Sequence, residues 1–278
     1  MKKWLILLLC LILLLCLILL PVCAPAEDSD GDILAEELIE AVILEDDGTV
    51  TPDTDLPADP EFTEASSAAR DDLIDRIIAL GEKLYRKANG KKQRAHYAGD
   101  IYVCKNYTVY LFRQNRDDFR MAEYPDVSLV IPDNMDPDGC KPYYYGFLWK
   151  DIPAEKGNPF YPAAQFIYDS DLSKEENLKL ACEFMRQAQR GDFFQMSANY
   201  DYGVGAHSAI MMGYDAEKDE IHWLDSNMRG GKDKNGIRYG LVQYDEVRSV
   251  EWWAEAFCHK KRGATLYRLR DDIIYKEN

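Results

Sequence analysis

The chain is 278 residues long, 47% of its residues are hydrophobic, and its formal net charge is −16. A chain of this length can bury a large core without disulfide staples, and its lack of a basic face excludes a typical nucleic-acid-binding protein. The acidity is concentrated in residues 27–64, which hold fifteen Asp and Glu and no Lys or Arg, so that residues 65–278 carry only about −3.

The N-terminus has the order of a secretory signal peptide. Two lysines precede the apolar run Trp4–Leu20, and the small-residue site Ala24-Pro25-Ala26 follows. The run exceeds the ~7–15 residues usual for such a core and reaches the lower limit of ~17–25 for a spanning helix. We therefore expect residues 1–26 to be cleaved, with an uncleaved membrane tether as the first alternative and lipidation at Cys23, a poorer match, as the second. In each case the remaining chain would be secreted or held at the extracytoplasmic cell surface.

Residues 27–64 are expected to form an acidic, disordered spacer, because like charges without counter-charges oppose collapse. Apolar residues at helical spacing between Ile33 and Ile43 could still form a short amphipathic helix within it.

Beyond the leader the chain has four cysteines, Cys104, Cys140, Cys182 and Cys258. They form no CxxC motif and no paired Cys/His spacing of a zinc site, so no metal centre is expected. If Cys104 is a nucleophile, at least one of the other three stays unpaired, and the sequence leaves their pairing open.

From residue 65 the pattern predicts one domain, residues 65–278. A first helix is expected from about Ser67 to a stop at Asn89-Gly90. A second helix is expected to begin at Cys104 and to run to about Arg116.

Residues 121–165 are rich in Pro, Gly and aromatic residues and predict irregular structure with short strands. The capping box of Ser173 and Glu176 then opens a helix to about Gln189. The aromatic residues of the irregular part could form a wall of a substrate cleft or the core of an inserted lobe. They are Tyr143, Tyr144, Tyr145, Phe147, Trp149, Phe160 and Tyr161.

After Gln189 the pattern changes to strands separated by turns. Helical segments followed by antiparallel strands predict an α+β fold rather than alternating βαβ units. The expected strands are Phe193–Met196, His207–Tyr214, Glu220–Leu224, Ile237–Tyr244 and Ala264–Leu269, with a helix over Val250–Phe257.

Cys104 and His207 are the first two members of a candidate thiol site. At the first turn of a helix, backbone N–H groups favour the thiolate of Cys104 and could stabilise an oxyanion. His207 opens the most apolar strand and could take the proton of the thiol. The plain alternatives are a small buried cysteine and a structural histidine. The other histidines, His96, His222 and His259, are less well placed.

The third member is either Asp225 or Asn227. They lie two positions apart, so they share one face if the strand extends that far, and either suits a partner on the strand beside His207. Asp225 is favoured, because a carboxylate stabilises an imidazolium more than an amide does. The alternative is that Asp-Ser-Asn is only a polar turn at a strand end.

The order of these signals resembles the papain-like amidases and peptidases of the NlpC and CHAP groups. The similar parts are Leu73–Tyr85, Asp100–Phe112, Arg190–Met196 and Gly205–Asn227. The resemblance implies N-terminal helices, with the cysteine at a helix start, packed on an antiparallel sheet. It also implies hydrolysis of an amide, typically in cell-wall peptides, without a metal or organic cofactor.

The chain departs from both groups. Val103-Cys104-Lys105-Asn106 stands where Asp-Cys-Ser-Gly is usual, and Asp225 is closer to the acidic residue of CHAP domains than to the histidine usual in NlpC enzymes. The separation of 103 positions between Cys104 and His207 is long and leaves room for an inserted lobe.

We therefore expect a secreted thiol hydrolase in which Cys104 attacks an amide carbonyl, His207 transfers the proton, and Asp225 or Asn227 orients the imidazole. The expected partner is a peptide or peptidoglycan substrate and not a nucleic acid, and the oligomeric state is left open. One alternative is a catalytically silent binding or adhesion module on the same fold. The other is a transglutaminase-like acyl transferase, which also uses Cys, His and Asp.

Overall fold

A computed structural model describes residues 64–95, 101–132, 152–232, 234–236 and 238–277. The expected signal peptide and the acidic spacer, apart from Glu64, lie outside the described residues. So do His96, Cys140 and the aromatic residues between 143 and 149. No helix in the described ranges has both the length and the hydropathy that crossing a membrane requires.

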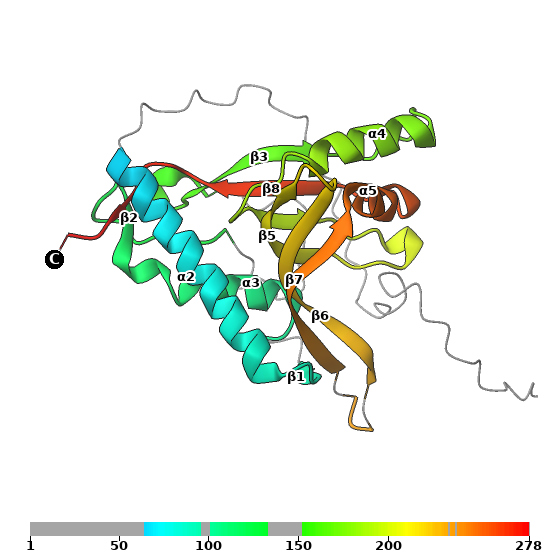
Figure 1. The fold of residues 1–278 in the computed structure, drawn as a ribbon, viewed down its shortest axis with the longest axis horizontal. Coiled ribbons are helices and arrows are strands. Elements are labelled where there is room, and N and C mark those ends of the chain that lie inside the picture. Colours follow the sequence, from blue (N-terminus) through cyan, green and yellow to red (C-terminus); the bar gives the residue numbers. More distant parts are fainter. Residues whose placement is uncertain (1–63, 96–100, 133–151, 233, 237, 278) are drawn as a thin grey trace, which may run out of the picture. The chain divides into compact units, whose positions relative to one another are not determined.

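The described part of the chain combines α-helices with antiparallel strands (Figure 1). The helices are α2 (Glu64–Ala88), α3 (Cys104–Arg113), α4 (Lys174–Met185) and α5 (Val250–His259), with short 3-10 turns at Arg116–Asp118, Ala154–Lys156 and Tyr200–Tyr202. The strands are β1 (Gln93–Ala95), β2 (Phe119–Met121), β3 (Phe160–Phe166), β4 (Phe193–Met196), β5 (His207–Asp215), β6 (Glu220–Lys232), β7 (Arg238–Ser249), β8 (Ala264–Leu269) and β9 (Ile273–Tyr275).

A seven-stranded sheet is the centre of this fold. Its order is β1-β7-β6-β5-β4-β8-β3, and β2 and β9 form a separate two-stranded sheet. Every pairing is antiparallel, which confirms the predicted α+β class.

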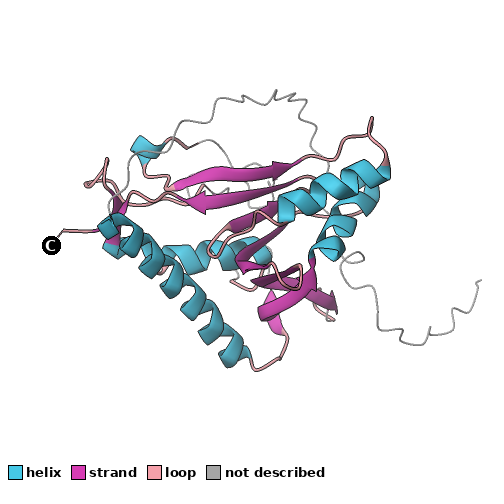
Figure 2. Ribbon diagram, turned by 45° about the horizontal axis from the view of Figure 1, so that its top comes forward, coloured by secondary structure: helices cyan, strands magenta, loops and turns pink. Residues whose placement is uncertain are grey.

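Two apolar cores lie on the two sides of the large sheet. Since alternate residues of a strand face opposite sides, Phe193 joins the core with α2 and α3, whereas its neighbour Phe194 joins the core with α4 and α5. Ile210 and Ala209 of β5 divide in the same way. The fold is therefore a sheet between two helical layers, with α2 and α3 on one side and α4 and α5 on the other (Figure 2).

The helix signals in the sequence are confirmed, although two helices end early. Asn89 and Gly90 both have positive φ directly after α2, as the predicted stop requires. The capping box of Ser173 and Glu176 is present at the start of α4, which ends at Met185 and not near Gln189. Beyond the end of α4, the backbone N–H of Gln189 donates a hydrogen bond to the buried carboxylate of Asp192. The helix that begins at Cys104 ends at Arg113, and a 3-10 turn follows.

The five predicted strands are also confirmed, whereas β1 and β9 were not predicted, β7 extends past Tyr244 to Ser249, and β6 is longer than predicted. It continues past Leu224 to Lys232, because β7 pairs with it along most of its length. The turn into β6 is held by Asp215, whose side chain accepts the backbone N–H groups of Glu217 and Lys218.

The flanks of the region expected to form an inserted lobe belong to the two sheets. β2 pairs with β9, and β3 pairs with β8 along the edge of the large sheet. Phe160 is buried between Phe112 and Phe193 in the core beneath α3, so this aromatic residue is a core residue of the domain.

Candidate functional site

Cys104 is the first residue of α3. The preceding Val103 is extended and makes no side-chain cap, and its carbonyl accepts the first helical hydrogen bond from the Tyr107 N–H at 2.8 Å. The backbone N–H groups of Lys105 and Ser208 donate to the sulfur. The start of α3 and the start of β5 therefore each present one amide donor to the sulfur, which favours the thiolate.

The segment before Cys104 is held closely against the sheet. The Ser226 hydroxyl on β6 donates to the Tyr102 carbonyl at 2.8 Å. Opposite, Gly240 of β7 has no side chain, and a Cβ there would lie 2.2 Å from the same carbonyl oxygen. This close approach fixes where α3 begins and therefore where the thiol lies.

His207 is the first residue of β5, opposite Met196 of β4. Its side chain is buried, and its Nε2 lies 2.7 Å from Oδ2 of Asp225 on the neighbouring strand β6. The imidazole is also hydrogen-bonded to the Cys104 thiol. Since Nε2 faces Asp225, Nδ1 is the ring nitrogen left for the sulfur.

Asp225 lies opposite Gln243 of β7, just after an irregularity in the strand register. Its carboxylate is buried, and within the described residues its Oδ1 atom makes no hydrogen bond. Asn227 lies two positions further along β6, opposite Leu241, and makes no hydrogen bond with His207. The structure thus brings together Cys104, His207 and Asp225.

The electrostatics of the three groups favour a thiolate–imidazolium pair. Burial alone raises the pKa of the Cys104 thiol, but the hydrogen bond and charge of His207, with the Ser208 and Lys105 amides, lower it below its usual value. Burial alone lowers the pKa of His207, but hydrogen bonds to Asp225 and Cys104 raise it to about 9. Burial, followed by the negative charge of Asp225, raises the pKa of nearby Tyr107, so its phenol stays neutral.

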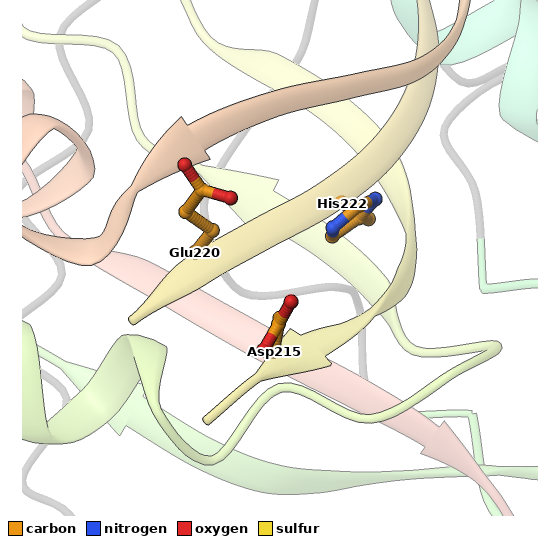
Figure 3. A group of neighbouring side chains, drawn as sticks. All are labelled: Asp215, Glu220 and His222. Carbon is orange, nitrogen blue, oxygen red and sulfur yellow. The ribbon is translucent and has the colours of Figure 1, made fainter. Parts of the chain in front are cut away.

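A second titratable cluster lies at the turn between β5 and β6. Asp215, Glu220 and His222 present ligand-type atoms within 4.8 Å of one another (Figure 3). However, Asp215 already binds the Lys218 ammonium at 3.0 Å, and His222 Nδ1 pairs with Asp245 at 2.7 Å. These contacts engage two of the three ligand-type side chains with other groups of the protein, and the cluster is a weak candidate for a metal centre.

Sequence reasoning missed one charged group that interacts electrostatically with the thiol, Arg262. It follows α5 and is buried, and its charge interacts with Cys104. No motif identifies Arg262, because the run Lys260-Lys261-Arg262 is typical of a basic turn exposed to solvent. The adjacent Gly263 is the one signal for a tight connection at this position.

The arrangement has the parts needed for nucleophilic catalysis: an activated thiol, a base in contact with it, and a carboxylate that orients the base.

No family model, no curated protein and no solved structure matches this chain.

Proposed function

We propose that residues 65–278 form a papain-like thiol hydrolase that cleaves an amide bond. The observation that carries the proposal is the continuous contact from Cys104 to His207 to Asp225, contributed by the start of a helix and two neighbouring strands. The antiparallel α+β architecture is compatible with the resemblance to the NlpC and CHAP groups.

In the proposed reaction the Cys104 thiolate attacks the amide carbonyl and forms a tetrahedral adduct, whose oxyanion the amide N–H groups at the start of α3 would stabilise. His207 donates its proton to the leaving nitrogen, the C–N bond breaks, and a thioester remains. Neutral His207 then takes a proton from water as the water attacks the thioester. The acid leaves, and the thiolate–imidazolium pair is restored.

The proposed substrate is a peptide of the cell wall. The signal-like leader would bring the enzyme out of the cytoplasm, and the resemblance points to peptidoglycan. The acidic spacer, residues 27–64, would separate the domain from any membrane tether.

The test is a mass-spectrometric analysis of cell-wall fragments treated with the wild-type protein, Cys104→Ser and Cys182→Ser. Cys182 lies on α4, where burial raises the pKa of its thiol, so it serves as a matched control cysteine. We expect hydrolysed fragments with the wild type and Cys182→Ser and none with Cys104→Ser. Intact fragments with a reactive Cys104 would refute this substrate class. An unreactive thiol would instead favour the silent module, and transfer of the acyl group to an added amine would identify a transferase.

A further inference from the structure

Arg262 is a buried cation without a carboxylate partner among the described residues. It lies between α5 and β8, and its side chain is only 6% exposed. Its Nε donates to the Ser197 carbonyl at 2.7 Å, and its Nη2 donates to the Gly205 carbonyl. Both acceptors are neutral, so they orient the guanidinium without balancing its charge.

The strand register places this guanidinium at the catalytic end of the sheet. Met196 of β4 lies opposite both His207 of β5 and Ala264 of β8, so the three residues form one row across the sheet. Ser197 and Arg262 lie just beyond this row on their own chain segments. Arg262 therefore ties together the two ends of the connection between β4 and β5, which leads into the strand carrying the base.

Among the described residues, the charge of Arg262 interacts with Cys104, although the larger charge effect on the thiol itself comes from His207. Burial lowers the pKa of Arg262 to about 10, and the negative charge of Cys104 opposes that effect. At neutral pH the guanidinium therefore stays protonated. A buried charge is costly unless an opposite charge compensates it, and a thiolate would do so.

We propose that Arg262 is a positioning residue: a permanent cation that, together with His207, keeps Cys104 in its thiolate form. The inference rests on the proposed role of Cys104 as the nucleophile.

The other charged and titratable groups near the thiol have different roles. His207 faces it from β5, and Asp225 of β6 acts on it through His207. On α3 itself, Tyr107 stays neutral, and Lys105 supplies a backbone N–H to the sulfur and also carries a buried amino group at the end of its side chain. Arg262 therefore adds a fixed cation to the charge that His207 supplies in the free enzyme.

The experiment measures the rate of Cys104 alkylation by iodoacetamide against pH, with peptide mapping to separate it from the other cysteines. It compares the full-length wild type with Arg262→Gln, Arg262→Lys and Asn199→Ala. Asn199 is the matched control, because its side chain ties the same loop to the Lys260 and Lys261 carbonyls but carries no charge.

We expect Arg262→Gln to move the acid limb of the profile, where the alkylation rate of Cys104 falls as the thiol becomes protonated, to higher pH by about one unit. At a given pH on that limb, the rate of the variant would be about tenfold lower than that of the wild type. Arg262→Lys and Asn199→Ala should keep the limb within about 0.3 units of the wild type, even if their melting temperatures fall. A folded Arg262→Gln with the wild-type limb would overturn the inference. The same shift in all three variants would also overturn it, because loop anchoring would then be the cause.

If Arg262→Gln does not fold, Arg262→Lys decides: a folded lysine variant with an ordinary thiol pKa would overturn the inference. Alkylation needs no substrate, so the result does not depend on finding the scissile bond. An ordinary thiol pKa in the wild type would instead count against the proposed thiolate–imidazolium pair itself.

Discussion

Replacement of Asp225 by alanine is the sharpest test of the candidate site, with Asn227→Ala as its control. Both residues lie on β6, two positions apart, but only Asp225 is hydrogen-bonded to the His207 imidazole. Removing Asp225 takes away the partner that orients the ring and supports its charge. Removing Asn227 should leave that contact intact.

The size of the effect follows from the burial of the pair. The 2.7 Å contact joins two side chains that are 10% and 4% exposed. A hydrogen bond to a charged group contributes about 1.5–3 kcal/mol, which corresponds to roughly a 10- to 150-fold change in rate. Without the carboxylate, burial would dominate and lower the pKa of His207, and the Cys104 thiol would lose its charged partner.

The assay is the rate constant at saturating substrate, with folding checked by circular dichroism, and the alkylation rate of Cys104 as a readout that needs no substrate. We expect Asp225→Ala to be at least about tenfold slower than Asn227→Ala in both measurements. Asp225→Asn, which keeps the shape and loses the charge, should fall between Asp225→Ala and the wild type. If Asn227→Ala were the slower alanine variant, the amide would be the orienting group and the assignment of Asp225 would be wrong.

The other predictions concern pH, the spacer and the core. Since the pKa of Cys104 is lowered and that of His207 raised to about 9, the rate should be on a plateau at neutral pH and fall as pH rises through about 9; a rate that keeps rising to pH 10 would exclude the ion pair. Truncation to residue 65, which removes residues 27–64, should leave activity and melting temperature nearly unchanged, and a loss of several degrees would show that the spacer docks on the domain. Arg268→Ala should cost about 3–5 kcal/mol in denaturant unfolding, because it leaves the carboxylate of Asp192, which is 0% exposed and bound to Arg268 at 2.8 Å, without its counter-charge; a loss below about 1 kcal/mol would contradict this account of the pair.

Most elements of the fold could be predicted from the sequence because their signals are local, whereas the three-residue strands β1 and β9 could not. The helix stop at Asn89-Gly90 needs residues that accept positive φ, and the capping box of Ser173 and Glu176 lies within one turn. The strand that begins at His207 likewise follows from its own apolar residues and the turns beside it. Element ends were less certain, as at Lys232 of β6, because pairing with a neighbouring strand decides how far a strand extends.

The sequence by itself determined the candidate residues: a cysteine at a helix start, a histidine at a strand start and two possible partners on the next strand. Only the tertiary structure showed that Asp225, and not Asn227, contacts the His207 imidazole, because strand register, not alternation alone, decides which side chain meets the ring. Only the tertiary structure brought Arg262 into electrostatic interaction with a thiol that is 158 positions away in the chain. The physical reason is that a short pattern encodes backbone conformation, whereas the electrostatic field at Cys104 is the sum of groups brought together from distant segments.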